Sequence, residues 1–137
     1  MVSFWSKSTP SVQEEQIPSD HFFHKIREHS LSRRQLDSSR VLNKYPNRIP
    51  VIVDRGDNKT NSIGKHKYLV PKECTLGEFQ AIIRAKIHLS STDALFCYVG
   101  KEHVLCRMTD LMNDIYAQHA DEDGFLYITY LQEATFG

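Results

Sequence analysis

The sequence predicts a single α+β domain, and three observations indicate this class. Two β-branched segments, 48–53 and 67–70, flank a polar, glycine-containing loop at 54–66, which is typical of a hairpin. A helical pattern of apolar residues then begins at residue 76, and an apolar strand follows at 125–131. Because a helix crosses between strands, at least two strands should pair in parallel.

Composition limits the classes of function. The 137 residues hold 17 Lys and Arg against 17 Asp and Glu, and this zero net charge argues against a nucleic-acid partner. No apolar run approaches the roughly 18 residues that indicate a membrane span. Cys74, Cys97 and Cys106 form no C-x-x-C pair, and an odd number of cysteines without a signal peptide favours free thiols in a reducing compartment.

The first 19 residues form a separate region. Residues 1–19 hold two prolines, five serines and no hydrophobic periodicity, which predicts a mobile arm. The aromatic pair Phe4-Trp5 is read either as part of a solvated tail, which we favour, or as a docking element.

Two helices should follow the arm. Asp20 can cap the first of them, which carries Phe22, Phe23 and Ile26. Ser32 with Gln35 reads as a capping box that opens a second, short helix ended by Pro46. The expected apolar contacts of this second helix are Leu36 and Val41.

The remaining elements follow from local signals. Pro50 lacks an N–H, so one side of its strand should be incompletely paired near this residue. Thr75 with Glu78 is a capping box that opens the clearest helix in the chain. The apolar positions of this helix are Leu76, Phe79, Ile82, Ile83 and Ile87.

The last part of the chain should contain two strands and a helix. The run 95–99 predicts a strand, and Thr109 can cap a helix. A turn at 121–124 leads into 125–131, whose continuous apolar run suits a central strand. The expected stripe of the helix is Leu111, Met112, Ile115 and Tyr116. Hairpin, crossing helix and strand form the core of a β-grasp, although the pattern alone leaves other α+β folds open.

Four short stretches carry a resemblance to a known family. They occur in this order: Asn47-Arg48-Ile49-Pro50-Val51-Ile52, Lys67-Tyr68-Leu69-Val70-Pro71, Asp123-Gly124-Phe125-Leu126-Tyr127-Ile128-Thr129-Tyr130 and Thr135-Phe136-Gly137. From about Asp20 to Gly137 the chain resembles the autophagy-related ubiquitin-like modifiers. The resemblance implies a ubiquitin-like β-grasp with two additional N-terminal helices. The expected organisation is an arm (1–19), a domain (20–131) and a conjugation tail (132–137).

The resemblance further implies that the carboxylate of Gly137 is joined to the amine of phosphatidylethanolamine. A glycine has no Cβ, so its backbone can enter a narrow enzyme groove. The two acyl chains of the lipid then anchor the protein, whereas one chain gives only marginal binding. The implied partners are ubiquitin-like activating and conjugating enzymes, a cysteine protease that processes and deconjugates the chain, and the membrane. The protein is expected in the cytoplasm when free and on the autophagosome membrane when lipidated.

A second implication is a groove for receptor and adaptor peptides with an acidic, aromatic-x-x-aliphatic motif. Such a peptide adds as a strand to the edge at 67–70. The implied aromatic pocket consists of Asp37, Val41, Pro50, Ile52, Lys67, Leu69 and Phe125. The implied aliphatic pocket consists of Tyr68, Val70, Pro71, Cys74, Phe79 and Ile82, and Arg48 and Lys86 would meet the acidic flank. Core packing is the competing interpretation of the apolar members.

Phe96 and Tyr98 match family positions used by the conjugation machinery or a second class of partner, and core packing is an equal alternative. Cys74 stands where the family usually has a larger aliphatic residue, which should make the second pocket wider or shallower. The segment 100–108 is longer than usual for the family and lacks its prolines.

No catalysis, cofactor or metal is expected. His21 and His24 could share a helix face, but no third metal ligand lies near them in the sequence. Two alternatives to the modifier remain. One is a ubiquitin-fold module that docks peptides but is never conjugated. The other is a thiol enzyme using Cys97 or Cys106, which is disfavoured because Cys97 lies among apolar strand residues.

Overall fold

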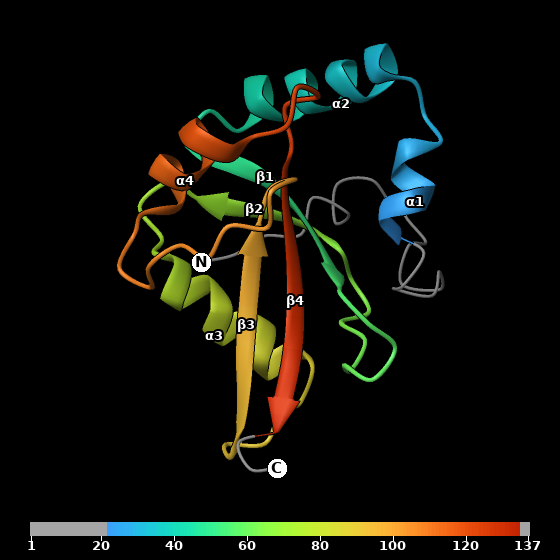
Figure 1. Cartoon of the computed structure of the whole chain (residues 1–137). Coiled ribbons are helices and arrows are strands. Elements are labelled where there is room, and N and C mark those ends of the chain that lie inside the picture. Colours follow the sequence, from blue (N-terminus) through green and yellow to red (C-terminus); the bar gives the residue numbers. More distant parts are fainter. Residues whose placement is uncertain (1–21, 135–137) are drawn as a thin grey trace.

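The computed structural model describes residues 22–134, and these residues form four helices and four strands (Figure 1). In chain order they are α1 (Phe22–Arg27), α2 (Leu31–Lys44), β1 (Arg48–Arg55), β2 (Lys67–Pro71), α3 (Leu76–Lys86), β3 (Asp93–Val99), α4 (Met112–His119) and β4 (Leu126–Ala134). The predicted order of elements is confirmed. The arm 1–19, the expected cap Asp20, His21 and the last three residues lie outside the described part.

The strands form one sheet in the order β2-β1-β4-β3. The central strands β1 and β4 run parallel, with Val51 opposite Leu126, while β2 and β3 pair antiparallel on the two edges. Both the parallel pair and the central position of the last strand were predicted from the sequence. The arrangement leaves β2 with a strand neighbour on only one side within residues 22–134.

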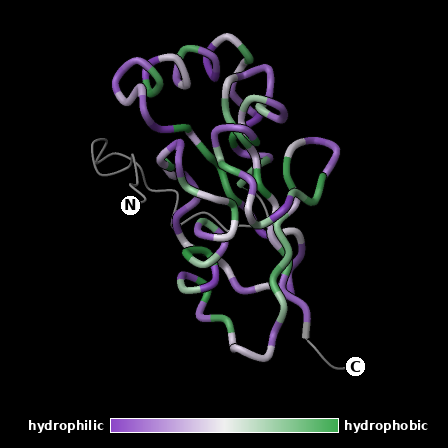
Figure 2. The backbone as a smooth tube through the Cα atoms, turned by 90° about the vertical axis from the view of Figure 1, so that its left-hand side faces the viewer, coloured by the Kyte–Doolittle hydropathy of each residue, from purple (hydrophilic) through white to green (hydrophobic). Residues whose placement is uncertain are grey.

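Helices cover both faces of the sheet (Figure 1). On one face α3 and α4 pack against the sheet through the larger core cluster, which includes Phe79, Ile83 and Met112 together with Val51 and Ile128. On the other face α1 and α2 cover a smaller cluster. Figure 2 shows stretches of hydrophobic residues through the middle of the molecule and many hydrophilic residues in its outer parts.

The start of α3 is as predicted. Glu78 N donates to Thr75 Oγ1 at 3.1 Å, and Thr75 N donates to Glu78 Oε1 at 2.9 Å, which completes the capping box.

The start and the packing of α2 differ from the prediction. Its N-cap is Ser30, whose Oγ accepts from Arg33 N at 3.1 Å. Gln35 makes no capping bond to Ser32, because its amide donates to the carbonyl oxygen of Glu122 at 3.0 Å. The helix has 14 residues and is not short. Leu36 is 47% exposed, so it is not a packing contact.

The cap of α4 also differs. Leu111 occupies the N-cap position without a side-chain bond, and Thr109 is not the cap. The preceding residues form a turn in which Arg107 N donates to Asp110 Oδ2, and Leu111 then bridges to Thr75. Leu111 is 41% exposed and leaves the predicted apolar stripe, whereas Met112 and Ile115 are buried as expected.

Two findings concern strand pairing. Pro50 lies opposite Leu69 of β2, and the parallel ladder to β4 begins one residue later at Val51, so the prediction of incomplete pairing near Pro50 is confirmed. Strand β4 continues to Ala134, because Ala134 lies opposite Asp93 of β3. Residues 132–134 therefore belong to the strand and not to a tail that begins at 132.

Candidate functional site

The predicted peptide-binding edge is the outer side of β2. Val53 N donates to His66 O at 2.8 Å and Lys72 N to Asn47 O at 3.1 Å, which fixes the hydrogen-bonded pairs between β1 and β2. Antiparallel ladders alternate, so Tyr68 and Val70 direct their main-chain groups towards β1. The main-chain groups of Leu69 point towards the outer edge. An extended peptide could therefore continue the sheet at this strand.

The side chains of β2 alternate between the two faces of the sheet. Leu69 joins the smaller cluster under α1 and α2 with Ile52 and Phe125, and Val41 of α2 packs against this cluster. These are four of the seven residues expected in the aromatic pocket. The other three are placed as follows: Asp37 lies one turn before Val41 on α2, Pro50 is on β1, and Lys67 begins β2.

The opposite face of β2 carries the residues expected in the aliphatic pocket. Tyr68, Val70, Cys74 and Phe79 all belong to the larger cluster, and the rings of Tyr68 and Phe79 meet edge to face with centroids 5.6 Å apart. Ile82 lies one turn after Phe79 on α3 and is half-buried, and Pro71, at the end of β2, is also half-buried. The residues expected in the aromatic pocket and those expected in the aliphatic pocket therefore lie on opposite faces of β2.

The charged residues of this region lie around the edge. Arg48 Nη1 donates to the carbonyl oxygen of Leu69 at 3.3 Å, which brings a guanidinium to the outer side of β2. Lys86 is exposed at the end of α3. Asp37 forms an ion pair with Arg33 at 3.5 Å on the surface of α2.

The residues of this region differ in burial. We call the half-buried ones, such as Val41, Pro71 and Ile82, the rim, and the buried ones the floor. Ile52, Tyr68, Leu69, Val70 and Phe79 each expose 1% or less of their surface. Within the described structure they are packed as core residues. A peptide side chain could contact them only after the neighbouring side chains move.

Phe96 and Tyr98 lie on the face of β3 opposite to Leu95, Cys97 and Val99. The latter three are buried in the larger cluster, whereas Phe96 and Tyr98 are half-buried. The alternation therefore favours a surface position over a core position for this pair.

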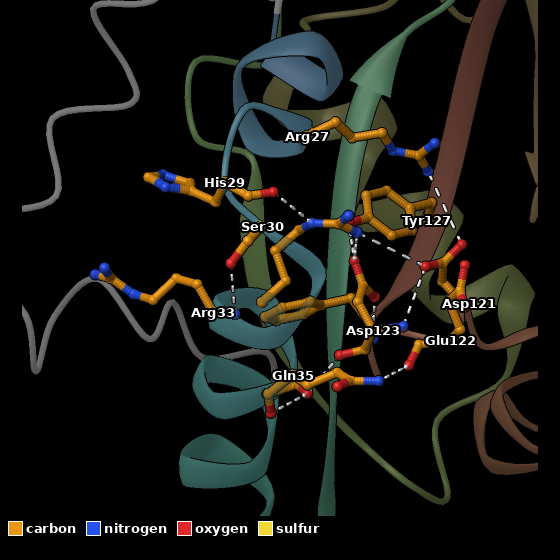
Figure 3. Close-up of polar contacts among 12 residues, drawn as sticks. Arg27, His29, Ser30, Arg33, Gln35, Asp121, Glu122, Asp123 and Tyr127 are labelled. Atoms are coloured by element: carbon orange, nitrogen blue, oxygen red, sulfur yellow. Dashed lines mark hydrogen bonds and ion pairs between the residues drawn. The ribbon is translucent and has the colours of Figure 1, made fainter.

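A polar network that the sequence did not reveal holds α2 in place (Figure 3). The carboxylate of Asp123 is fully buried and accepts from Arg34 Nη1 at 2.8 Å and from the Tyr127 hydroxyl at 2.6 Å. Ser38 Oγ donates to the carbonyl oxygen of Asp123 at 2.6 Å. These contacts join α2 to the turn before β4, so they fix the helix that carries Asp37 and Val41.

A second buried carboxylate holds α1. Asp54 Oδ2 accepts from Phe23 N at 3.2 Å, and Asp54 lies 3.9 Å from the ring nitrogen Nδ1 of His66. The ring of Phe22 stacks on His66 with centroids 4.1 Å apart. Burial raises the pKa of Asp54 to about 7, so this carboxyl group titrates near neutral pH.

Comparison with known proteins identifies the family. A family model described as autophagy protein Atg8, ubiquitin-like, matches residues 33–137. Autophagy-related protein 8c of Arabidopsis thaliana is 48% identical over 111 residues, covering 80% of this chain and 92% of its own length.

The chain belongs to the Atg8 family.

Further relatives agree with this assignment. Autophagy-related protein 8 of Mycosarcoma maydis is 45% identical over 111 residues, covering 80% of this chain and 92% of its own length. The crystal structure of Trypanosoma brucei ATG8 superimposes with a TM-score of 0.72 at 35% identity, covering 83% of this chain and 97% of that one. The expected family and the ubiquitin-like fold with N-terminal helices are confirmed. The chain is thus a ubiquitin-like modifier of autophagy.

The thiols of this Atg8 protein do not have the environment of catalytic cysteines. Burial raises the pKa of Cys97 to about 12, and burial also raises the pKa of Cys106. A catalytic cysteine needs a lowered pKa, because the thiolate is the nucleophile. Members of the Atg8 family are modifiers rather than enzymes.

Residues 22–134 contain neither of two features that would suggest a membrane span or a metal site. No helix in this range is long and apolar enough to cross a bilayer. The same residues contain no cluster of three or more His, Cys, Asp or Glu side chains arranged to hold a metal ion.

Proposed function

We propose that Gly137 is the residue through which this Atg8 protein is joined to phosphatidylethanolamine on forming autophagosomes. The family match, which extends to residue 137, is the observation that supports this most directly. Strand β4 ends at Ala134, so Gly137 follows the sheet by three residues. We propose that this spacer lets an enzyme reach the Gly137 carboxylate.

The chemistry proceeds through two successive enzyme thioesters before the amide bond forms. An activating enzyme first couples the carboxylate of Gly137 to a nucleoside triphosphate, which releases pyrophosphate, and an enzyme thiol then displaces the nucleoside monophosphate to form a thioester. The lipid amine then attacks the thioester carbonyl, an amide bond forms and the thiol leaves. A conjugating enzyme holds the second thioester, and a cysteine protease hydrolyses the amide when the modifier is recovered. The protein is cytoplasmic before the transfer and bound to the autophagosome membrane afterwards.

Substitution of the terminal residue tests this proposal. Gly137→Ala adds a Cβ at the transfer point and should abolish lipid attachment while leaving the urea unfolding curve unchanged. Thr135→Ala is the matched control in the same segment and should be conjugated normally. The assay mixes each protein with activating and conjugating enzymes and phosphatidylethanolamine vesicles. The proposal would be contradicted if Gly137→Ala became attached to the vesicles through its C-terminus at the wild-type rate.

We also propose that the outer edge of β2 binds receptor and adaptor peptides with an acidic, aromatic-x-x-aliphatic motif. The support is the outer side of β2, which has no strand neighbour within residues 22–134, together with the apolar clusters on the two faces of this strand. The peptide main chain would bond to β2, and its two apolar side chains would enter opposite faces. Arg48, Lys67 and Lys86 supply positive charge for the acidic residues of the motif.

Because the floor residues are buried in this structure, binding requires the rim to open. Half-buried side chains such as Val41, Pro71 and Ile82 would have to move aside. We therefore expect an association rate below that of a preformed pocket, since a conformational change slows binding.

The groove is tested by calorimetry with an acidic aromatic-x-x-aliphatic peptide. Lys67→Ala removes charge at the rim, and Lys67→Ala with Leu69→Ala also removes apolar contact; both should weaken binding, the double variant more. Leu69 is 1% exposed, so its truncation also costs about 2–5 kcal/mol of stability, and unfolding curves must show that the variant is folded. Lys59→Ala, in the exposed loop before β2, is the control. Equal affinities for all four proteins would reject this docking mode.

The alternative function is a peptide-docking adaptor that is never conjugated. Peptide binding at the β2 edge does not require conjugation through Gly137. A failure of one proposal would therefore leave the other standing. A protein that binds the peptide but stays unconjugated in the presence of active conjugation enzymes would be such an adaptor.

A further inference from the structure

A cavity of about 430 Å³ lies on the face of the sheet that carries α1, away from the β2 edge. It is open to solvent on one side and is bordered by α1, by the turn that follows β3 and by β4. Its described lining includes Phe23, His24, Arg27, Lys101, His103 and Tyr127. This volume is within the usual range for small-ligand sites.

The lining has an unusual chemical composition. Arg27 and Lys101 are cationic, and His24 and His103 carry imidazoles that can donate hydrogen bonds. No carboxylate side chain is found among the described residues that line the cavity. The nitrogen-bearing side chains come from two elements far apart in the sequence, α1 and the turn at 100–103.

The walls of the cavity are held in place. The guanidinium of Arg27 lies over the ring of Tyr127 at 4.8 Å, and Phe23 meets the same ring edge to face at 5.4 Å. The Tyr127 hydroxyl donates to the buried Asp123 at 2.6 Å. Figure 3 shows Arg27 extended across the Tyr127 ring. The arginine is thus oriented before any ligand arrives.

The turn is held as well. Gly100 N donates to the carbonyl oxygen of Tyr127 at 2.9 Å, and His103 N donates to the carbonyl oxygen of Gly100 at 3.2 Å. Gly100 and His103 both have positive φ, at 75° and 54°. A left-handed histidine is uncommon, and here it closes the turn that borders the cavity.

Acidic residues near the cavity do not saturate its cations. Asp121 lies 4.0 Å from Arg27 and 3.4 Å from Lys101, and Glu122 lies 3.9 Å from Lys101. All three separations exceed the usual length of a charge-assisted hydrogen bond, about 2.7–2.9 Å. Asp121 is also shared with Arg34 at 4.0 Å. The two cations therefore keep donors for a further anion.

We propose that this cavity binds the phosphate group of a small soluble phosphate ester. A phosphate monoester carries about −1.5 to −2 charges and three acceptor oxygens. Guanidinium, ammonium and imidazole groups line the cavity from α1 and from the turn at 100–103, and their N–H groups match those oxygens. The aromatic wall of Phe23 and Tyr127 would contact the ester's organic part.

The position of the cavity favours a soluble ligand over a lipid headgroup, and this step alone rests on the proposed attachment through Gly137. Val99 pairs with Ile128 at the cavity end of the sheet, and Asp93 pairs with Ala134 at the other end. Six residues of strand separate the two ends by roughly 20 Å at about 3.3 Å per residue. The cavity thus lies at the opposite end of the sheet from the tail that would hold the membrane.

The test is a titration of the ¹⁵N-labelled full chain with inorganic phosphate at constant ionic strength, followed by amide chemical shifts. Saturable shifts should appear at Gly100, Lys101, His103 and Tyr127. Lys101→Gln and His103→Gln should each weaken binding at least fivefold. Both side chains are exposed, and urea unfolding curves must show that His103→Gln is folded, because residue 103 has a φ of 54°. Arg107→Gln, an exposed cation of the same connecting segment outside the cavity lining, is the control and should leave binding unchanged.

Two further measurements distinguish a soluble phosphate ester from a lipid headgroup. Myo-inositol monophosphate in solution should compete with inorganic phosphate, whereas vesicles that contain phosphatidylinositol monophosphate should not bind the unconjugated chain more tightly than the soluble ester does. Tighter binding to the vesicles that is lost in Lys101→Gln would show that the ligand is a lipid headgroup. It would overturn the proposal of a soluble ester. Shifts that chloride reproduces, or equal affinities in all variants, would overturn the site itself. The titration and its variants use the unconjugated chain, so they test the site itself whether or not Gly137 is conjugated.

Discussion

Replacing Arg34 with methionine should destabilise the domain strongly, because it removes a charged partner of a buried carboxylate. Arg34 Nη1 lies 2.8 Å from Asp123 Oδ2, and the Asp123 side chain is fully buried. The variant Arg34→Met keeps most of the aliphatic stem but leaves that carboxylate without its cation. The Tyr127 hydroxyl and Phe125 N remain as its hydrogen-bond donors.

The magnitude follows from the burial of the pair. Removing one partner of a buried ion pair costs about 3–5 kcal/mol. The side chain of Arg34 is 16% exposed and two donors to Asp123 remain, so we expect the lower part of that range, about 3 kcal/mol. Arg34 Nε also donates to the carbonyl oxygen of His29 at 3.2 Å, and losing this bond adds to the cost.

The assay is urea unfolding at pH 7, with Arg33→Met as the matched control one residue earlier. Arg33 pairs with Asp37 at 3.5 Å, but their side chains are 60% and 40% exposed, and such a pair contributes less than about 1 kcal/mol. The double variant Arg34→Met with Asp123→Asn should recover part of the loss, because the buried charge is gone. Equal unfolding free energies for the two single variants would refute this reasoning.

Two further predictions concern other parts of the structure. Gly124→Ala should cost at least about 2 kcal/mol, because Gly124 has φ +90° and an added Cβ would clash with Ser38 Oγ; a thermal midpoint within 2 °C of wild type would contradict this. Asp54 has a pKa raised by burial from 3.8 to about 7, so the folded state binds the proton more tightly than the unfolded state. Stability is therefore expected to fall as pH rises from about 4 to 7, by at most about 1.4 kcal/mol per pH unit, and Asp54→Asn should flatten this slope in urea midpoints measured across that range. If Asp54→Asn keeps the full slope of stability against pH, other titrating groups cause that slope and this prediction is wrong.

The elements that the sequence predicted well are those with local signals. The capping box of Thr75 and Glu78 depends on residues three positions apart, and the structure contains it as expected. The start of α2 was missed because Ser30 and Ser32 are both acceptable caps. Only the contact between Gln35 and Glu122, residues far apart in the chain, decides between the two serines.

The same distinction applies to the candidate site. Strand alternation places Leu69 and Tyr68 on opposite faces of the sheet, and this much follows from a period of two. The assignment of these residues to peptide pockets came from the resemblance to a family and stays a prediction. The bond between Arg34 and Asp123 joins residues 89 positions apart, and no local pattern reveals it.

The phosphate cavity was also beyond sequence reasoning. It requires α1 and the turn after β3 to meet over β4, and His103 there adopts a positive φ that its residue type does not predict. The sequence singled out 100–108 only as a departure from the family. An observation of length and composition could not show which side chains of the segment meet α1.

The most direct test of the central claim is mass spectrometry of the C-terminal peptide. The protein would be purified from starved cells that express the chain, with Gly137→Ala as the control. We expect a phosphatidylethanolamine adduct on the carboxylate of Gly137 that is absent from the variant. A free Gly137 carboxylate throughout, in cells where another Atg8 protein is lipidated, would show that Gly137 is not the conjugation point.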